Sequence, residues 1–417
     1  DNGYLGNKFL RDKTSELIIA GMKTATHATK VIAVQSVSKA SNDVKVVVSS
    51  FWLNLFNFFE GDEVVETPIG KNQGFDIRPA ALDDTGTKKV YGRNYPQRKT
   101  NKREPVMDIR NQTKLNLSIG SAKSVRIIFK KSLLTVLPIF SGEQQARSEA
   151  LDITLPKDNG LYYGVIAAVK ILKEHLFTEF TIASDEEFAN SREFTLLTIQ
   201  VRRLGYEINV VDGLITGRLG TKSILKRHSI DVSMSKLTNR PLRFDRSNPL
   251  TTTGVCTSGV DICAAQDDGF STLNVLDYRP IEMRDLKSKQ DRSETGAICA
   301  AFNTKSIKTI FNECIYGMDT VLMRDLMRPT NFLSLSLQCS DYSTVKNQND
   351  KDKAVDSLAT TIDMFVPVLD IIEKNNYATL LTENVANFAN SIECKLYVRR
   401  LEELGYKVNQ SILNAEN

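Results

Sequence analysis

Histidine, tryptophan and paired cysteines are scarce in this chain of 417 residues. It holds three histidines and one tryptophan, and its six cysteines include no CxxC pair. A zinc site of the usual ligand spacing is therefore excluded. Scattered cysteines are typical of proteins in a reducing compartment, so we expect free thiols. We also expect no bound metal ion and no other cofactor.

Long apolar runs are missing as well. The most apolar stretch, residues 46–59, is broken by serines and asparagines and falls short of the roughly 18 residues that a membrane-spanning helix needs. Residues 1–13 lack the apolar segment of a secretory signal. We therefore expect no membrane span and a cytoplasmic location, which for a viral protein means the host cytoplasm or the virion.

The common catalytic motifs do not occur either. The sequence has no nucleophile elbow, HExxH motif, kinase motif set or dinucleotide fingerprint. The glycine-containing segment at 210–223 fails as a Walker loop because Thr221 separates Gly220 from Lys222. An anion site made by Arg218, Lys222 and backbone amides stays open. The absences favour a protein that is not an enzyme, although catalytic residues that converge only in three dimensions escape a motif search.

The chain does contain an internal repeat. FANSREFTLLTIQVRRLGYEIN at 188–209 aligns without gaps with FANSIECKLYVRRLEELGYKVN at 388–409, and ten of the 22 positions are identical. Upstream of both segments, apolar residues recur at helical spacing. Each copy is therefore predicted to contain a helix, a short strand, a second helix and a second strand.

The ends of the second helix follow the same pattern in both copies. Ser184 and Thr382 are predicted N-caps, and Gly205 and Gly405 stand where a helix ends in a left-handed residue. Further upstream, a short helix and then two strands around a tight turn are expected in each copy. The short helices are predicted at 112–122 and 304–318, and the strand pairs at 124–140 and 320–338.

These patterns predict an α/β (α+β) fold with two tandem-duplicated small α/β modules, each with a mixed sheet. The first module is expected at 106–212 and the second at 301–417, joined by a β-rich and loop-rich insert at 213–300. Residues 1–105 are expected to form an N-terminal arm with a helical pattern at 15–34, an apolar segment and a basic linker.

The strongest local charge lies at 87–105, in a chain whose net charge is only +4. Cations with interleaved tyrosines are typical of arms that hold single-stranded nucleic acid, because the cations neutralise phosphates while the rings stack on bases. A solvated linker, or an arm docked on an acidic neighbour, is the alternative. The candidate nucleic-acid-binding residues are Lys88, Lys89, Tyr91, Arg93, Tyr95, Arg98, Lys99, Lys102 and Arg103.

The apolar run at 46–59 carries apolar side chains on every face, so it has to be buried. It packs either inside the N-terminal domain or against another subunit, since aromatic residues are enriched at subunit interfaces. The candidate interface residues are Phe51, Trp52, Phe56 and Phe59.

A duplicated module with polar arms and no catalytic motif is typical of a building block, because related surfaces favour repeated association. We expect a non-enzymatic, self-associating structural or assembly protein of viral, phage type that forms a homo-oligomer. Its arms would link subunits or contact nucleic acid. Two alternatives stay open: a single-stranded nucleic-acid-binding protein of replication or transcription, and an enzyme that acts on a nucleotide or phosphorylated substrate through residues 213–223.

Overall fold

A computed structural model describes ten segments of the chain, and they fall into two compact units that we treat one at a time. The described residues are 30–40, 43–49, 52–94, 103–140, 192–203, 206–211, 214–219, 250–257, 259–278 and 304–413. Unit 1 consists of Asp1–Ile139, Asp245–Cys314 and Leu326–Ser334, and unit 2 consists of Phe140–Phe244, Ile315–Asp325 and Leu335–Asn417. The domain boundaries proposed from the sequence stay a prediction.

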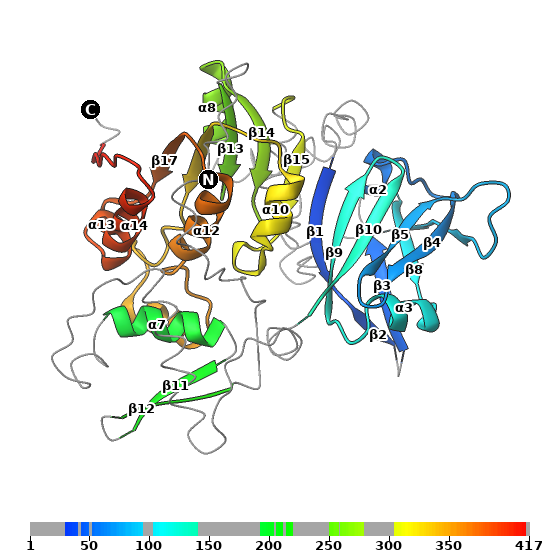
Figure 1. Cartoon of the computed structure of the whole chain (residues 1–417), viewed down its shortest axis with the longest axis horizontal. Helices are drawn as coiled ribbons and strands as arrows, with labels where there is room; N and C mark the ends of the chain where they lie inside the picture. The colour runs from blue at the N-terminus through cyan, green and yellow to red at the C-terminus, as the bar shows by residue number, and fades with distance from the viewer. Residues whose placement is uncertain are drawn as a thin grey trace, which may run out of the picture. The chain divides into compact units, whose positions relative to one another are not determined.

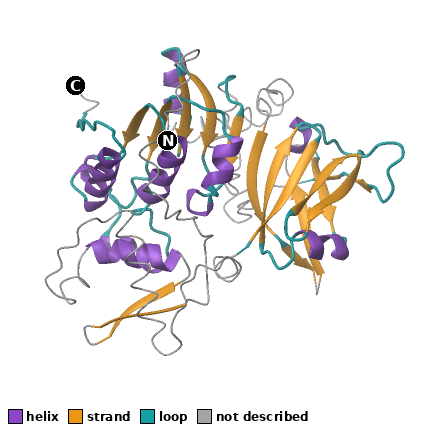
Figure 2. Ribbon diagram, viewed as in Figure 1, coloured by secondary structure: helices purple, strands orange, loops and turns teal. Residues whose placement is uncertain are grey.

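Unit 1 is built mainly from strands, with a few short helices (Figure 2). Its strands are β1 (Lys30–Ser36), β2 (Ser38–Ala40), β3 (Asp43–Ser49), β4 (Glu63–Gly70), β5 (Gly74–Pro79), β6 (Lys88–Lys89), β7 (Tyr91–Arg93), β8 (Glu104–Ile109), β9 (Ser124–Lys130), β10 (Leu133–Ile139), β13 (Thr251–Val255), β14 (Ser271–Leu276), β15 (Thr309–Asn312) and β16 (Phe332–Ser336). Its helices are α2 (Trp52–Leu55), α3 (Gln112–Ser118) and α8 (Val260–Asp267). The last two residues of β16 belong to unit 2.

The large sheet of unit 1 joins a parallel part to an antiparallel part. Its strand order is β16-β13-β14-β15-β1-β9-β10-β5-β4-β6, and a second sheet has the order β2-β3-β8-β7. Strand β1 is the junction, because it pairs in parallel with β15 and antiparallel with β9. Apolar residues on both faces of β1 and β9 are buried, as expected for strands covered on two sides.

A strand, helix, strand segment belongs to the parallel part of the sheet of unit 1. Strand β13 leads through a short turn into α8, which returns the chain to β14, the parallel neighbour of β13 (Figure 1). Gly254 of β13 allows the helix to pack closely, since a Cβ atom there would lie 2.9 Å from Cδ1 of Ile262. The mixed α/β class predicted from the sequence is thus confirmed.

Unit 2 is mainly helical. It contains α7 (Arg192–Arg203), the 3-10 helix η2 (Ile315–Gly317), α10 (Thr320–Leu326), α11 (Gln348–Asp356), α12 (Phe365–Asn375), α13 (Ala386–Ala389) and α14 (Ile392–Glu403). Its strands are β11 (Tyr206–Val211), β12 (Leu214–Leu219) and β17 (Thr379–Glu383). Helix α12 buries Phe365, Val368 and Ile372, and Arg400 of α14 donates a hydrogen bond of 2.8 Å to Glu373 of α12.

The second helix of the repeat is present in both copies, as α7 and α14, at positions two hundred residues apart. In the second copy, Gly405 follows the helix with a φ of 91°, which confirms the predicted left-handed end. The N-cap prediction is wrong there. Ser391 caps α14 by accepting a 3.1 Å hydrogen bond from the amide of Cys394, whereas Thr382 lies within β17.

The two copies differ after this helix. In the first copy, β11 pairs antiparallel with β12, which confirms the strand predicted at that position. In the second copy, residues 406–411 form no strand. A strand needs a partner for its backbone hydrogen bonds, and β12 provides one only in the first copy. The first helix and first strand of that copy, and its N-cap residue Ser184, lie outside the described residues.

Three other predictions of local structure are wrong. Residues 30–34 belong to strand β1 and not to a helix, because Val31, Ile32 and Ala33 are all buried in the sheet. Strand β15 occupies the middle of the short helix predicted at 304–318. Helix α10 replaces the first of the two strands predicted at 320–338. In each case packing in the parallel sheet and its helices overrides the local pattern.

Candidate active site

The last residues of β16 and β17, both in unit 2, lie side by side, and polar residues follow both strands. The hydroxyl of Ser336, the last residue of β16, donates a 2.6 Å hydrogen bond to Oε2 of Glu383, the last residue of β17. One residue beyond the end of each strand, Nδ2 of Asn384 donates a 3.2 Å hydrogen bond to the carbonyl of Leu337. In α/β proteins, ligands bind beyond the carboxyl ends of sheet strands.

Cys339 lies three residues beyond β16, in the loop that starts at this edge. Of the cysteines in the described ranges, it alone has an exposed side chain. Its carbonyl accepts hydrogen bonds from the amides of Tyr342 at 3.0 Å and Ser343 at 2.9 Å, so the loop turns directly after the thiol. Cys394 differs, because burial and the charge of Glu393 raise the pKa of its thiol. A buried thiol with a raised pKa is a poor nucleophile.

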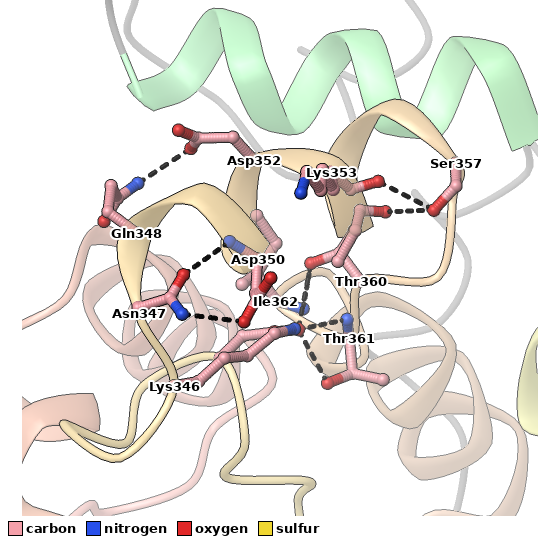
Figure 3. A network of polar contacts seen from close by, with 12 residues as sticks. Lys346, Asn347, Gln348, Asp350, Asp352, Lys353, Ser357, Thr360, Thr361 and Ile362 are labelled. Atoms are coloured by element: carbon pink, nitrogen blue, oxygen red, sulfur yellow. Dashed lines mark hydrogen bonds and ion pairs between the residues drawn. The ribbon is translucent and has the colours of Figure 1, made fainter.

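Asp341 anchors the loop that carries Cys339. Its carboxylate accepts hydrogen bonds from Lys346 Nζ at 2.5 Å, from the Thr361 amide at 2.6 Å and from the Thr360 hydroxyl at 3.0 Å. These donors gather on one side of α11 (Figure 3). Burial alone would raise the pKa of Asp341, but the donated hydrogen bonds outweigh it and hold the pKa below its ordinary value. The loop is therefore fixed by an ionised aspartate.

Tyr342 ties the same loop to the segment after β17. Its ring packs against Phe388 with centroids 4.9 Å apart and an interplanar angle of 71°, a favourable edge-to-face arrangement. Its carbonyl accepts a 3.1 Å hydrogen bond from Asn387, and its hydroxyl donates to the carbonyl of Ile362 at 2.8 Å. Burial raises the pKa of Tyr342 far above its usual range, so the hydroxyl stays protonated. The loop of Cys339 is thus joined at several points to the segment that follows Glu383.

A separate constellation lies in unit 1, in the turn between β13 and α8. The hydroxyl of Thr257 donates to Asp261 and accepts a 2.9 Å hydrogen bond from the amide of Gly259. Gly259 has a φ of 103°, a conformation that glycine adopts without strain. Asp277 is buried directly after β14. A glycine turn before a helix, with an acidic residue after the next strand, is typical of sites that bind the ribose of a nucleotide.

Two cations of the predicted nucleic-acid arm have acidic partners inside unit 1. Lys88 forms an ion pair of 2.8 Å with Glu66, and Arg103 forms one of 2.7 Å with Glu60. Lys88 and Lys89 form β6, while Tyr91 and Arg93 lie in β7. The remaining candidates, Tyr95, Arg98, Lys99 and Lys102, lie outside the described residues. Of the described candidates, Lys88 and Arg103 are thus paired with acidic residues, and the nucleic-acid arm stays a prediction.

The other predicted sites lie only partly within the described residues. Arg218 lies in β12 opposite Glu207 of β11, and Lys222 lies outside the described residues. Trp52 and Phe56 are buried in unit 1, whereas Phe59 is 50% exposed. Phe51 is not among the described residues. The anion site and the subunit interface stay predictions, as does the homo-oligomer.

Sequence reasoning missed Cys339, Glu383 and Asn384. A usable signal was present, because FLSLS and TLLTE are short apolar strands that each run into polar residues. The turn at Gly259 was missed for another reason, since the pattern of 213–300 indicates an insert and not part of a parallel sheet.

None of the helices within the described ranges is long and apolar enough to cross a membrane. The comparison with known families gives a match in the C-terminal part of the chain. Residues 297–417, less than a third of the chain, match the family of C-5 cytosine-specific DNA methylases. No curated protein matches the chain as a relative.

This match overturns the expected function. A methylase is an enzyme that acts on DNA, so the expectation of a non-enzymatic, self-associating structural protein is wrong. The viral and phage-type assignment has no support either. The expected nucleic-acid partner is supported in general form, since similarity to a DNA methylase implies DNA binding. The matched residues include both Cys339 and Glu383, and over this segment the chain is similar to C-5 cytosine-specific DNA methylases.

Proposed function

We propose that the protein transfers a methyl group to C5 of cytosine in DNA, with Cys339 as the nucleophile. The observation that carries the proposal is the exposed Cys339 thiol on a loop that is hydrogen-bonded to the residues following Glu383, inside the segment that matches the DNA methylases. Thiols in such partly exposed positions serve as covalent catalysts in many enzymes.

The chemistry of cytosine explains why a thiol is needed. C5 belongs to a conjugated ring and is a weak carbon nucleophile. When the thiolate of Cys339 adds to C6, an S–C6 bond forms, and the electrons of the C5=C6 bond become available at C5. C5 then bonds to the methyl group, whose former bonding pair leaves with the donor. Loss of the C5 proton to a base restores the double bond and expels the thiolate.

Glu383 suits the role of the acid in this reaction. Addition at C6 places negative charge on the ring, and a carboxylic acid that hydrogen-bonds or protonates the base at N3 would stabilise it. The Ser336 hydroxyl holds one oxygen of Glu383 at 2.6 Å, which fixes the orientation of the carboxyl group. Because C6 is not accessible inside a stacked duplex, the target base has to leave the helix, as it does for other enzymes that modify bases.

The methyl group requires an activated donor, for which S-adenosylmethionine is the general biological sulfonium compound. The turn between β13 and α8 fits an adenosyl group. Gly259 provides the tight turn, Gly254 allows close packing of strand and helix, and Asp277 is placed to bind ribose hydroxyls. These residues of unit 1 would hold the donor.

The test uses duplex DNA and S-adenosylmethionine with a labelled methyl group. Wild-type protein should place the label on C5 of cytosine, identified by mass spectrometry of the released nucleosides. Cys339→Ser should reduce the rate by at least about three orders of magnitude, because a hydroxyl is a far weaker nucleophile at neutral pH. Cys314→Ser serves as the matched control and should retain the wild-type rate. Equal labelling by Cys339→Ser, or a label on an exocyclic nitrogen, would overturn the proposal.

A further inference from the structure

A row of polar residues crosses four neighbouring strands of unit 1. The register pairs Thr253 of β13 with Asn274 of β14, and Asn274 with Thr309 of β15. Thr309 in turn pairs with Lys30 of β1. Residues paired directly across strands project from the same face of a sheet, so these side chains share one face. The first three are almost completely buried, whereas Lys30 is only half-buried.

The row continues with a second lysine. In the antiparallel pair of β1 and β9, Val31 lies opposite Phe129. Continued by one residue, this register places Lys30, the first residue of β1, opposite Lys130, the last residue of β9. Like charges directly opposite each other destabilise a sheet. Two lysines at adjacent strand ends are therefore an arrangement that folding alone does not favour.

The backbone of an arginine is hydrogen-bonded to the same row. The amide of Arg328 donates a 2.9 Å hydrogen bond to Oδ1 of Asn274, and its carbonyl accepts a 2.7 Å hydrogen bond from Nδ2 of the same side chain. Asn274 also donates to the hydroxyl of Thr253 at 2.9 Å. The polar row thus fixes the loop of Arg328 while the arginine side chain stays exposed.

The three cations lie close enough to affect one another. Burial lowers the pKa of Lys30, and the positive charges of Lys130 and Arg328 lower it further. Within the described part of the chain, no carboxylate forms an ion pair with Lys30, Lys130 or Arg328. Other cations of unit 1, such as Lys88 and Arg110, have acidic partners. An anion from outside the chain would relieve the repulsion in this cluster.

We propose that Lys30, Lys130 and Arg328 form a phosphate-binding cluster that contacts the DNA backbone. The choice of DNA as the anion rests on the proposed function, since a phosphodiester is the anion that every DNA substrate presents. Lysine and arginine side chains supply most of the contacts that position proteins on DNA. Such contacts carry no sequence information, so the cluster contributes affinity and orientation, and target choice is left to other residues.

The experiment measures duplex binding by fluorescence anisotropy at salt concentrations from about 50 to about 200 mM. The cluster variant combines Lys30→Gln, Lys130→Gln and Arg328→Gln. Its affinity should fall roughly tenfold at low salt, and the slope of log K against log salt should decrease by about one for each phosphate that the variant no longer neutralises. Its melting temperature should equal or exceed that of the wild type, because three mutually repelling charges are gone.

The matched control combines Arg78→Gln, Arg110→Gln and Arg399→Gln. It removes the same number of charges, but each of these cations already pairs with an acid, namely Asp84, Asp108 or Glu403. Its salt slope should stay that of the wild type. A wild-type slope in the cluster variant, or an equal decrease in the control, would overturn the cluster even if cytosine methylation is observed. Cluster-dependent binding without methyl transfer would instead overturn the proposed function and leave the cluster standing.

Discussion

At the scale of single residues, the position of Cys339 depends on buried neighbours. Cys339 itself is exposed, and its place is set by Asp341, whose side chain is only 2% exposed. Hydrogen bonds to a buried charged group are stronger than those between neutral groups. Removing that charge should therefore loosen the loop that carries the thiol.

Asp341→Asn should lower the free energy of unfolding by about 2 kcal/mol at pH 7. The pKa of Asp341 is lowered in the folded protein, so its stabilising effect is complete above the unfolded value of about 3.9 and is lost as the pH falls through the folded value. The difference between wild type and variant should accordingly shrink below about pH 4. Urea unfolding at several pH values measures it.

Asp352→Asn is the control, because Asp352 is exposed and accepts a 2.8 Å hydrogen bond from Gln348 at the surface of α11. It should unfold like the wild type at every pH. A difference between wild type and Asp341→Asn that does not depend on pH would contradict the charged role of Asp341.

At the scale of helices and strands, the repeat shows which sequence features determine a helix end locally. Helix α14 begins at the cap Ser391 and ends before Gly405, which has a positive φ. Because both residues act through neighbouring backbone groups, their effects belong to one helix and do not depend on the rest of unit 2.

Ser391→Ala should destabilise the protein by about 1 kcal/mol, since the Cys394 amide loses its hydrogen-bond acceptor. Urea unfolding of the purified variant measures the change. Ser391→Asp keeps an acceptor at this position and should unfold close to the wild type. If alanine and aspartate give the same stability, the side chain of Ser391 does not cap the helix.

The same contrast explains how much the sequence could predict. Helix α12, the end of α14 and strand β17 follow from apolar spacing and from Gly405, which are local signals. The local pattern wrongly predicts a helix at strand β15. This strand pairs with β14 and β1, which lie far away in the sequence, so its local pattern does not reveal the pairing. Cys339 and Glu383 could not be linked from sequence, since the segments that follow β16 and β17 are joined only by contacts of the folded chain.

At the scale of the whole molecule, unit 1 depends on one buried ion pair between distant parts of the chain. Arg126 of β9 donates to both carboxylate oxygens of Glu313, with 2.9 Å between Nε and Oε2. Both side chains are at most 4% exposed. The pair joins the antiparallel part of the sheet to the residue that follows β15.

Arg126→Met should destabilise the protein by roughly 3 to 5 kcal/mol, because Glu313 is left buried without its partner. Combining Arg126→Met with Glu313→Leu should recover most of this loss, since no buried charge then remains. Thermal unfolding of the two variants compares them. A double variant that is as unstable as the single one would show that packing, and not charge, accounts for the effect.

The central claim is that Cys339 forms a covalent bond to cytosine. Duplex DNA with 5-fluorocytosine at target positions should trap this covalent adduct. C5 then carries fluorine in place of the proton that has to be lost, so the double bond is not restored and the thiolate is not expelled. After incubation with S-adenosylmethionine, mass spectrometry should find one nucleotide adduct on the peptide that contains Cys339. An adduct on another residue, or methylated cytosine formed with no adduct in the trapping reaction, would contradict the account.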